Sequence, residues 1–296
     1  MSKKPKAKSK KGKTKPLTLS RWSVWSAPVR EWWEVVSRRR SPLTPPVRLL
    51  DEARIGSGDY DAVGMQFLKI FQNIGGLQPH HRVLDIGCGY GRMAKPLTDW
   101  LDASRGGSYV GFDVFPKSVR WAARAFGSRH PHFRFHHLNI RNCHYNPTGT
   151  ESDTTVRLPY PDGSFDFIFL TSIFTHLFPA AADHYLSEIS RLLSPEGRCL
   201  ATFFLLDDDT RRLISEGRTS VKFRHTDPSE GWMALNKEDP ERCIAFPVEQ
   251  VLAWHEKNGL VIEEPIHLGN WCERTQPYDF QDIIISRRMS APATPT

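Results

Sequence analysis

The sequence predicts an α/β fold with a mostly parallel sheet and helices on both faces. Short apolar segments alternate with amphipathic helical patterns through most of the chain, and this alternation is typical of a parallel sheet covered by helices. The segment 165–170 is continuously apolar apart from Asp166, as expected of a strand buried on both faces. A third observation is a glycine loop, Gly87-x-Gly89-x-Gly91, that joins the first predicted strand to a helical pattern.

The predicted elements follow one another in regular order. An amphipathic helix begins near Asp61 and ends at Gly75-Gly76. After it we expect strands over 82–86, 108–113, 132–138, 165–171, 198–205, 260–266 and 281–287, and helices over 92–101, 116–127, 180–193 and 247–258. No helical period separates the last two strands, so they are predicted to form a hairpin that makes one strand antiparallel.

The glycine loop and two acids indicate a nucleoside site. Glycines let the backbone approach a ligand closely, and an acid at the end of the next strand, Asp113, suits ribose hydroxyls. The first strand carries a further acid, Asp85, which would repel a pyrophosphate but suits a cation. S-adenosylmethionine (SAM) carries a sulfonium and an ammonium and no phosphate, so it fits this pattern.

Several motifs carry a resemblance to one enzyme family. The spacing D-x-G-x-G-x-G from Asp85 to Gly91 resembles the first motif of the class I SAM-dependent methyltransferases. Leu158 to Asp166 resembles their approach to strand four. Segments 55–59 and 269–274 resemble the "IG-x-GD" and "G-x-WC-x-R" segments of a group of small bacterial members with undefined acceptors. The resemblance implies the Rossmann-like class I methyltransferase fold, with seven strands, the last antiparallel, and SAM as cofactor.

The resemblance also implies roles for particular residues. The SAM-binding set is Asp85, Gly87, Cys88, Gly89, Gly91, Asp113, Val114, Asn139, Ile140 and Thr171. The loop backbone is expected against the methionine part, Asp85 near the ammonium, Asp113 on the ribose, and Val114, Asn139 and Ile140 around the adenine. Trp271 and Arg274 are expected to border the acceptor, and Arg54, Gly58 and Asp59 to close over the SAM carboxylate or the acceptor.

The catalytic candidate is His176, which follows the fourth predicted strand at the edge that faces the donor methyl. Methyl transfer to oxygen requires removal of a proton, which a histidine can accept; the alternative for His176 is a capping or packing residue. Weaker candidates are His144, Tyr145, His225 and His267. Because the five cysteines are scattered and no acids cluster near strand four, we predict no metal.

The basic charge belongs to the N-terminal region. The chain of 296 residues has a formal net charge of +7, but residues 1–50 alone carry +12, which leaves −5 for the remainder. Residues 1–15 hold eight lysines and are predicted to be disordered. A tryptophan-rich amphipathic helix over about 28–38 follows, and its alternatives are a helix packed on its own domain, contact of residues 1–40 with an anionic membrane, and contact with nucleic acid or a partner protein.

These observations define the expected organisation and function. We expect a basic tail over 1–45, a methyltransferase domain over 46–290 and a disordered terminus over 291–296, in a cytoplasmic protein that is either free or peripheral at a membrane. Insertions over 141–157 and 206–247 are expected to shape the acceptor pocket. The expected reaction is methyl transfer to a small-molecule or glycan acceptor at oxygen. The alternatives are an RNA or protein methyltransferase recruited by the tail, and a SAM-binding module without catalysis.

Overall fold

A computed structural model describes residues 40–52, 59–274 and 279–289. The chain divides into two compact units, of which the second begins at Leu43 and contains nearly all described residues. The predictions for the lysine-rich tail, the tryptophan-rich helix, Arg54, Gly58 and the C-terminal end lie outside the described residues.

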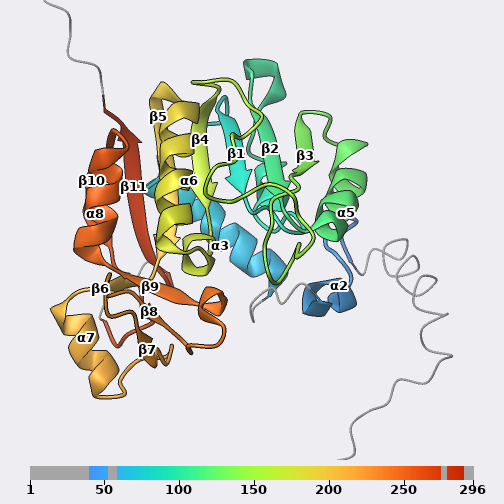
Figure 1. Cartoon of the computed structure of the whole chain (residues 1–296). Coiled ribbons are helices and arrows are strands. Elements are labelled where there is room, and N and C mark those ends of the chain that lie inside the picture. The colour runs from blue at the N-terminus through green and yellow to red at the C-terminus, as the bar shows by residue number, and fades with distance from the viewer. Residues whose placement is uncertain (1–39, 53–58, 275–278, 290–296) are drawn as a thin grey trace, which may run out of the picture. The chain divides into compact units, whose positions relative to one another are not determined.

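The unit from Leu43 onward is built on a seven-stranded sheet of order β10-β11-β5-β4-β1-β2-β3 (Figure 1). The strands are β1 (Arg82–Ile86), β2 (Ser108–Asp113), β3 (Phe133–His137), β4 (Phe165–Leu170), β5 (Leu193–Phe203), β10 (Leu260–His267) and β11 (Asp282–Arg288). β11 pairs antiparallel with both β5 and β10, whereas the neighbours from β5 to β3 pair in parallel. This confirms the predicted mixed sheet and its final hairpin.

The two faces of the sheet carry separate apolar clusters. Along β4, Ile168 and Leu170 join one cluster and Phe167 and Phe169 the other, because successive side chains of a strand point to opposite faces. The first cluster includes residues of α6 (Pro179–Leu192) and α8 (Val248–Lys257), and the second those of α3 (Tyr60–Asn73), α4 (Ala94–Leu97) and α5 (Pro116–Gly127). Helices therefore cover both faces, as predicted.

Two elements differ from their predicted bounds by more than two residues at one end. The helix predicted over 92–101 is reduced to α4, because the N–H groups of Asp99 and Trp100 bond three residues back rather than four. β5 begins at Leu193 instead of residue 198, and its pairing with β4 contains a register shift between Phe165 and Phe167. The short helix α2 (Val47–Glu52) and the 3₁₀ turns η1 (Ala103–Arg105), η2 (Phe174–His176) and η3 (Pro240–Arg242) complete this part of the unit.

The insertion after β5 forms a second, small sheet of order β6-β9-β8-β7. Its strands are β6 (Leu205–Leu206), β7 (His225–Thr226), β8 (Met233–Ala234) and β9 (Ile244–Pro247), and α7 (Asp208–Ser215) packs beside them with a separate apolar cluster. Asp207 caps α7 by accepting from the N–H of Thr210.

A helix that spans a membrane must be long and apolar. Within the ranges that the structure describes, no helix combines the length and the apolar character needed to cross a bilayer.

Candidate active site

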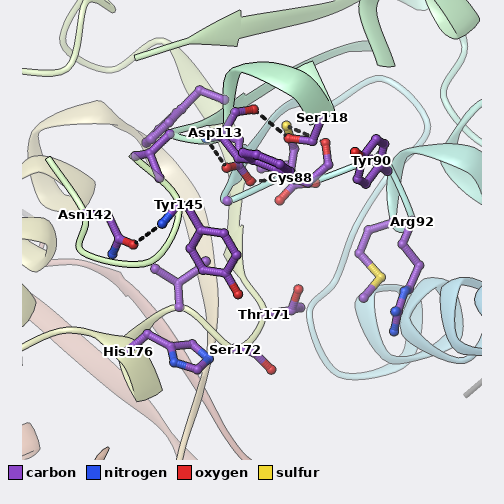
Figure 2. Close-up of a pocket in the computed structure, with 18 of the residues that line it drawn as sticks. Cys88, Tyr90, Arg92, Asp113, Ser118, Asn142, Tyr145, Thr171, Ser172 and His176 are labelled. Atoms are coloured by element: carbon purple, nitrogen blue, oxygen red, sulfur yellow. Dashed lines mark hydrogen bonds between the residues drawn. The ribbon is translucent and has the colours of Figure 1, made fainter. Parts of the chain in front are cut away.

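A pocket of about 730 Å³ opens at the carboxyl ends of β1, β2 and β4 (Figure 2). Nine of the predicted site residues line it: Asp85, Gly87, Cys88, Gly89, Asp113, Val114, Ile140, Thr171 and His176. Figure 2 shows Asp113 and Cys88 on one side, Ser172 and His176 on the other, and the ring of Tyr145 between them. This is the edge where ligands bind in parallel sheets, because the loops that leave the strands converge there.

The three glycines of the loop serve different purposes. All have positive φ, 84° at Gly87, 51° at Gly89 and 81° at Gly91, a region that disfavours other residues. An added Cβ would lie 2.1 Å from Ile173 Cδ1 at Gly87 and 2.9 Å from Phe126 Cε2 at Gly91, but would meet nothing within 4 Å at Gly89. Gly91 is not a lining residue, so its role is to seat the loop against α5, whereas Gly89 leaves open space for a ligand.

The backbone N–H groups of the loop are already used. Those of Gly87 and Cys88 both donate to the carbonyl of Phe112, at 2.9 and 3.0 Å. The N–H groups of Gly89 and Gly91 are also bonded within the protein, to Asp113 and to the Cys88 carbonyl. The loop therefore has few N–H groups left for a phosphate, which agrees better with a cationic ligand such as SAM.

Asp113 is held in place by the same loop. Its Oδ2 accepts from the N–H of Gly89 at 2.7 Å, and its Oδ1 accepts from the N–H of Phe115 at 2.8 Å. Burial raises the pKa of Asp113, and these two N–H groups oppose the rise. Each carboxylate oxygen keeps a lone pair for a further donor, so the side chain suits the ribose hydroxyls of a nucleoside.

Asp85 is buried beneath the loop. It accepts a 2.6 Å hydrogen bond from the Tyr109 hydroxyl, and burial raises the pKa of Asp85 to about 8 despite this bond. A cation in the pocket favours the ionised carboxylate and would lower this pKa. The residues of the loop and its two acids thus fit SAM.

On the adenine side the sequence prediction is only partly matched. Val114 and Ile140 line the pocket, but Asn139 is exposed and is not a lining residue. Its amide instead donates to Thr150 Oγ1 at 3.0 Å and accepts from Asn146 at 3.1 Å, which fixes the insertion after β3. These bonds make Asn139 a residue that shapes this insertion, and its expected contact with the adenine stays a prediction.

His176 lies in η2 and lines the opposite side of the pocket. Its Nδ1 is 2.9 Å from the carbonyl oxygen of Glu241. A carbonyl can only accept, so Nδ1 carries the proton and Nε2 of the neutral ring has a lone pair. Burial lowers the pKa of His176 from its ordinary value, although the Glu241 carbonyl opposes this, and the neutral form is favoured.

The backbone beside His176 is constrained. Ser172, which directly follows the edge of β4, has φ of 60°, a left-handed conformation that is unusual for a residue other than glycine. Its N–H donates to Thr202 at 2.8 Å and its hydroxyl to Gln281 at 3.0 Å. These bonds hold the turn from β4 into η2 and hence the position of His176.

Two residues expected near the acceptor are structural instead. Trp271 is fully buried and donates through Nε1 to Asp282 at 2.8 Å, and Arg274 pairs with Asp282 at 2.5 Å and with Asp207 at 3.2 Å. Neither lines the pocket. This corrects their expected role, because the final hairpin uses them to join β11 to the second sheet.

The insertions also divide in role. The first contributes Asn142, Tyr145 and Asp153 to the pocket lining, as predicted, but the second contributes no described residue. The second insertion reaches the pocket indirectly, through the Glu241 carbonyl on His176. His225 and His267 are not lining residues.

Sequence reasoning missed the contribution of residues 279–281, which line the pocket just before β11. Because β11 is antiparallel to β5, its first residue lies at the edge where the parallel strands end. The hairpin predicted from the sequence already implied that the residues just before the last strand lie at this edge. Arg92, directly after the glycine loop, is a further lining residue that the sequence analysis did not select.

Comparison with known proteins agrees with this geometry. Residues 84–201 match a family model described as a methyltransferase domain. A SAM-dependent methyltransferase from Clostridium acetobutylicum is similar in structure, with a TM-score of 0.52 at 11% identity over 83% of this chain and 98% of the other. The PH0226 protein from Pyrococcus horikoshii has a TM-score of 0.52 at 17% identity over 79% of this chain and 93% of the other.

Fold, site and family match together define the class. The chain has the fold of the class I methyltransferases, and residues 84–201 form a methyltransferase domain. The protein therefore contains a methyltransferase domain, and its glycine loop and two acids fit SAM as the methyl donor.

Proposed function

We propose that the protein transfers the methyl group of SAM to a hydroxyl of a small-molecule or glycan acceptor, with His176 as the general base. The observation that carries this proposal is the hydrogen bond of His176 Nδ1 to the Glu241 carbonyl, which leaves Nε2 as a proton acceptor at the pocket. A hydroxyl loses its proton as the new bond to carbon forms, so a neutral imidazole is the group this reaction needs.

The size of the pocket supports a small acceptor. Its volume of about 730 Å³ lies within the range of about 300–1,000 Å³ found for small-ligand sites, and SAM would occupy part of it. Tyr145, Ser172 and Gln281 border the half that holds His176, and such polar and aromatic groups suit a hydroxylated acceptor. The donor is already activated, so these residues assist mainly by holding the acceptor in line with the methyl group.

The test is a transfer assay with carbon-13-methyl SAM against a panel of sugars, phenols, amines and thiols. The carbon-13 chemical shift of the product distinguishes an O-methyl from an N-methyl or S-methyl group. With an oxygen acceptor, His176→Gln is expected to lower kcat by about 10²–10⁴-fold and to leave SAM affinity unchanged. The matched control is His225→Gln, at a histidine that does not line the pocket, and it should leave kcat unchanged. A panel product methylated only at nitrogen or sulfur, or an unchanged kcat in His176→Gln, would count against the proposal.

A further inference from the structure

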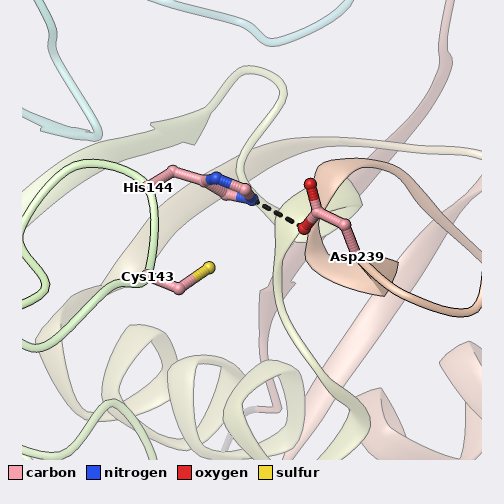
Figure 3. A group of neighbouring side chains, drawn as sticks. All are labelled: Cys143, His144 and Asp239. Carbon is pink, nitrogen blue, oxygen red and sulfur yellow. Dashed lines mark ion pairs between the residues drawn. The ribbon is translucent and has the colours of Figure 1, made fainter.

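A thiol, an imidazole and a carboxylate meet outside the pocket, where the insertion after β3 approaches η3 (Figure 3). Cys143 Sγ, His144 Nε2 and a carboxylate oxygen of Asp239 all lie within 4.8 Å of one another. None of the three residues lines the pocket. Cys143 and His144 belong to the insertion after β3, whereas Asp239 directly precedes η3 in the insertion after β5.

The distances approach those of a coordination shell. His144 Nε2 is 3.0 Å from Asp239 Oδ1, and Cys143 Sγ is 3.0 Å from Glu241 Oε2. In a tetrahedral zinc site with bonds of about 2.0–2.3 Å, two ligand atoms are about 3.3–3.8 Å apart. Small side-chain rotations would therefore bring these atoms around one cation, with Glu241 within reach as a fourth ligand.

The imidazole of His144 has a buried nitrogen that lacks a hydrogen-bond partner. His144 Nε2 is buried and makes no hydrogen bond, although Asp239 Oδ1 is beside it, because the two atoms are not aligned for one. A buried polar atom normally has a partner. A cation between the ring nitrogen and the carboxylate would satisfy both atoms, and the nearby Glu241 carboxylate adds negative charge that attracts it.

We propose that Cys143, His144 and Asp239 bind a divalent cation of the zinc type. Thiolate, imidazole and carboxylate are the ligands that zinc uses in proteins. On binding, the Cys143 thiol loses its proton to solvent as the metal–sulfur bond forms, and neutral His144 coordinates through the lone pair of Nε2. Cys143 is exposed, so the ion has access to the site.

The site has a structural consequence for the methyltransferase. Asn142 Oδ1 accepts from the N–H groups of His144 and Tyr145, both at 3.0 Å, so the ligand loop is continuous with the pocket wall. On the other side, η3 contains Glu241, whose carbonyl positions His176. A bound cation would tie these two segments together and order the acceptor half of the pocket without touching the reacting atoms.

The test uses the full chain, stripped with a chelator and titrated with Co²⁺ as a spectroscopic probe for zinc. Tetrahedral cobalt with a thiolate ligand gives visible d–d bands and a near-ultraviolet charge-transfer band. We expect one metal per chain, loss of the charge-transfer band in Cys143→Ser, and more than about tenfold weaker binding in His144→Ala and Asp239→Asn. His80→Ala, at an exposed histidine before β1, is the matched control and should bind as the wild type does.

A thermal melt provides a second readout that is independent of methyl transfer. Zn²⁺ should raise the Tm of the wild type and of His80→Ala, but not that of Cys143→Ser or Asp239→Asn. A stoichiometry well below one, or a cobalt spectrum that Cys143→Ser leaves unchanged, would overturn the proposal.

Discussion

Asp113 holds the glycine loop and presents its carboxylate to the pocket at the same time. The side chain accepts from Gly89 on one oxygen and from Phe115 on the other. The shape of the loop therefore depends on this residue, and the same carboxylate is the group that we propose binds the donor ribose. The order of the residues along the chain indicated the second role, but only the structure shows the first.

Replacement of Asp113 by alanine should weaken SAM binding by about 10–100-fold, because each hydrogen bond to a charged group contributes about 1.5–3 kcal/mol. Calorimetric titration with SAM measures this effect. Asp99→Ala, at an exposed acid that does not line the pocket, is the control and should bind normally. An Asp113→Ala variant with wild-type affinity would show that another group holds the ribose.

The protonation state of His176 predicts how kcat depends on pH. Burial lowers the pKa of His176, so its neutral, proton-accepting form is present at pH 7 and is lost only as the pH falls through that lowered pKa. The kcat should therefore be flat near neutrality and decline on an acidic limb below about 6.5, the ordinary pKa of histidine. Residual activity in His176→Gln should lack this limb. An acidic limb with the same midpoint in both enzymes would assign the titration to another group.

At the level of the element, two glycines of the loop are expected to affect different properties: Gly89 the binding of SAM, and Gly91 the stability of the fold. Alanine at Gly89 meets nothing nearby, whereas alanine at Gly91 would contact Phe126. Gly89→Ala should lower the free energy of unfolding by only about 1–2 kcal/mol, the cost of its positive φ, yet weaken SAM binding by more than tenfold (about 1.4 kcal/mol). Gly91→Ala should lose more stability because it adds a steric contact to the same strain.

Urea unfolding and SAM titration of the two glycine variants measure both quantities. A Gly89→Ala variant that binds SAM normally would mean that the open space beside this residue is not part of the donor site.

The final hairpin depends on one buried carboxylate. Asp282 accepts from the N–H groups of Leu205 and Gly269, from Trp271 Nε1 and from Arg274. Asp282→Asn should lower the free energy of unfolding by about 3–5 kcal/mol, because it removes the fully buried carboxylate of the ion pair and leaves Arg274 with Asp207 alone.

The matched control for Asp282→Asn is Glu273→Gln in the same segment. Glu273 pairs with Arg218 at 2.7 Å on the surface, where an ion pair contributes at most about 1 kcal/mol. Urea denaturation compares the two variants. Equal losses of stability would show that burial of Asp282 does not govern the strength of this joint.

At the level of the whole molecule, removal of the basic N-terminal region tests whether the acceptor is a small molecule or a macromolecule. The region carries +12 over residues 1–50, and the remainder carries −5. A truncation should end before Leu43, because this side chain is buried in the second cluster of the sheet. Removal of residues 1–39 should leave kcat/KM for a small acceptor unchanged within about twofold, because the described residues that line the pocket all follow Leu43.

The same truncation tests the alternative that the acceptor is RNA or a protein recruited by the tail. If the tail recruits RNA or a protein, turnover on that acceptor should fall on truncation and should fall in the full chain as salt rises, because salt screens the lysines. Methylation of a panel acceptor at equal rates with and without the tail would exclude recruitment as a requirement of the reaction.

The sequence by itself determined the order of strands and helices, the donor loop and the acid that follows it. These features are local: hydrophobic periodicity assigns β4, and the spacing from Asp85 to Gly91 describes a single turn of backbone. Tertiary structure decided which side chains of neighbouring segments face the pocket. Asn139 turns away, and Trp271 is buried in a joint, because each binds partners that are not adjacent in sequence. The tautomer of His176 depends likewise on a carbonyl 65 positions away, which only the folded chain brings within 2.9 Å.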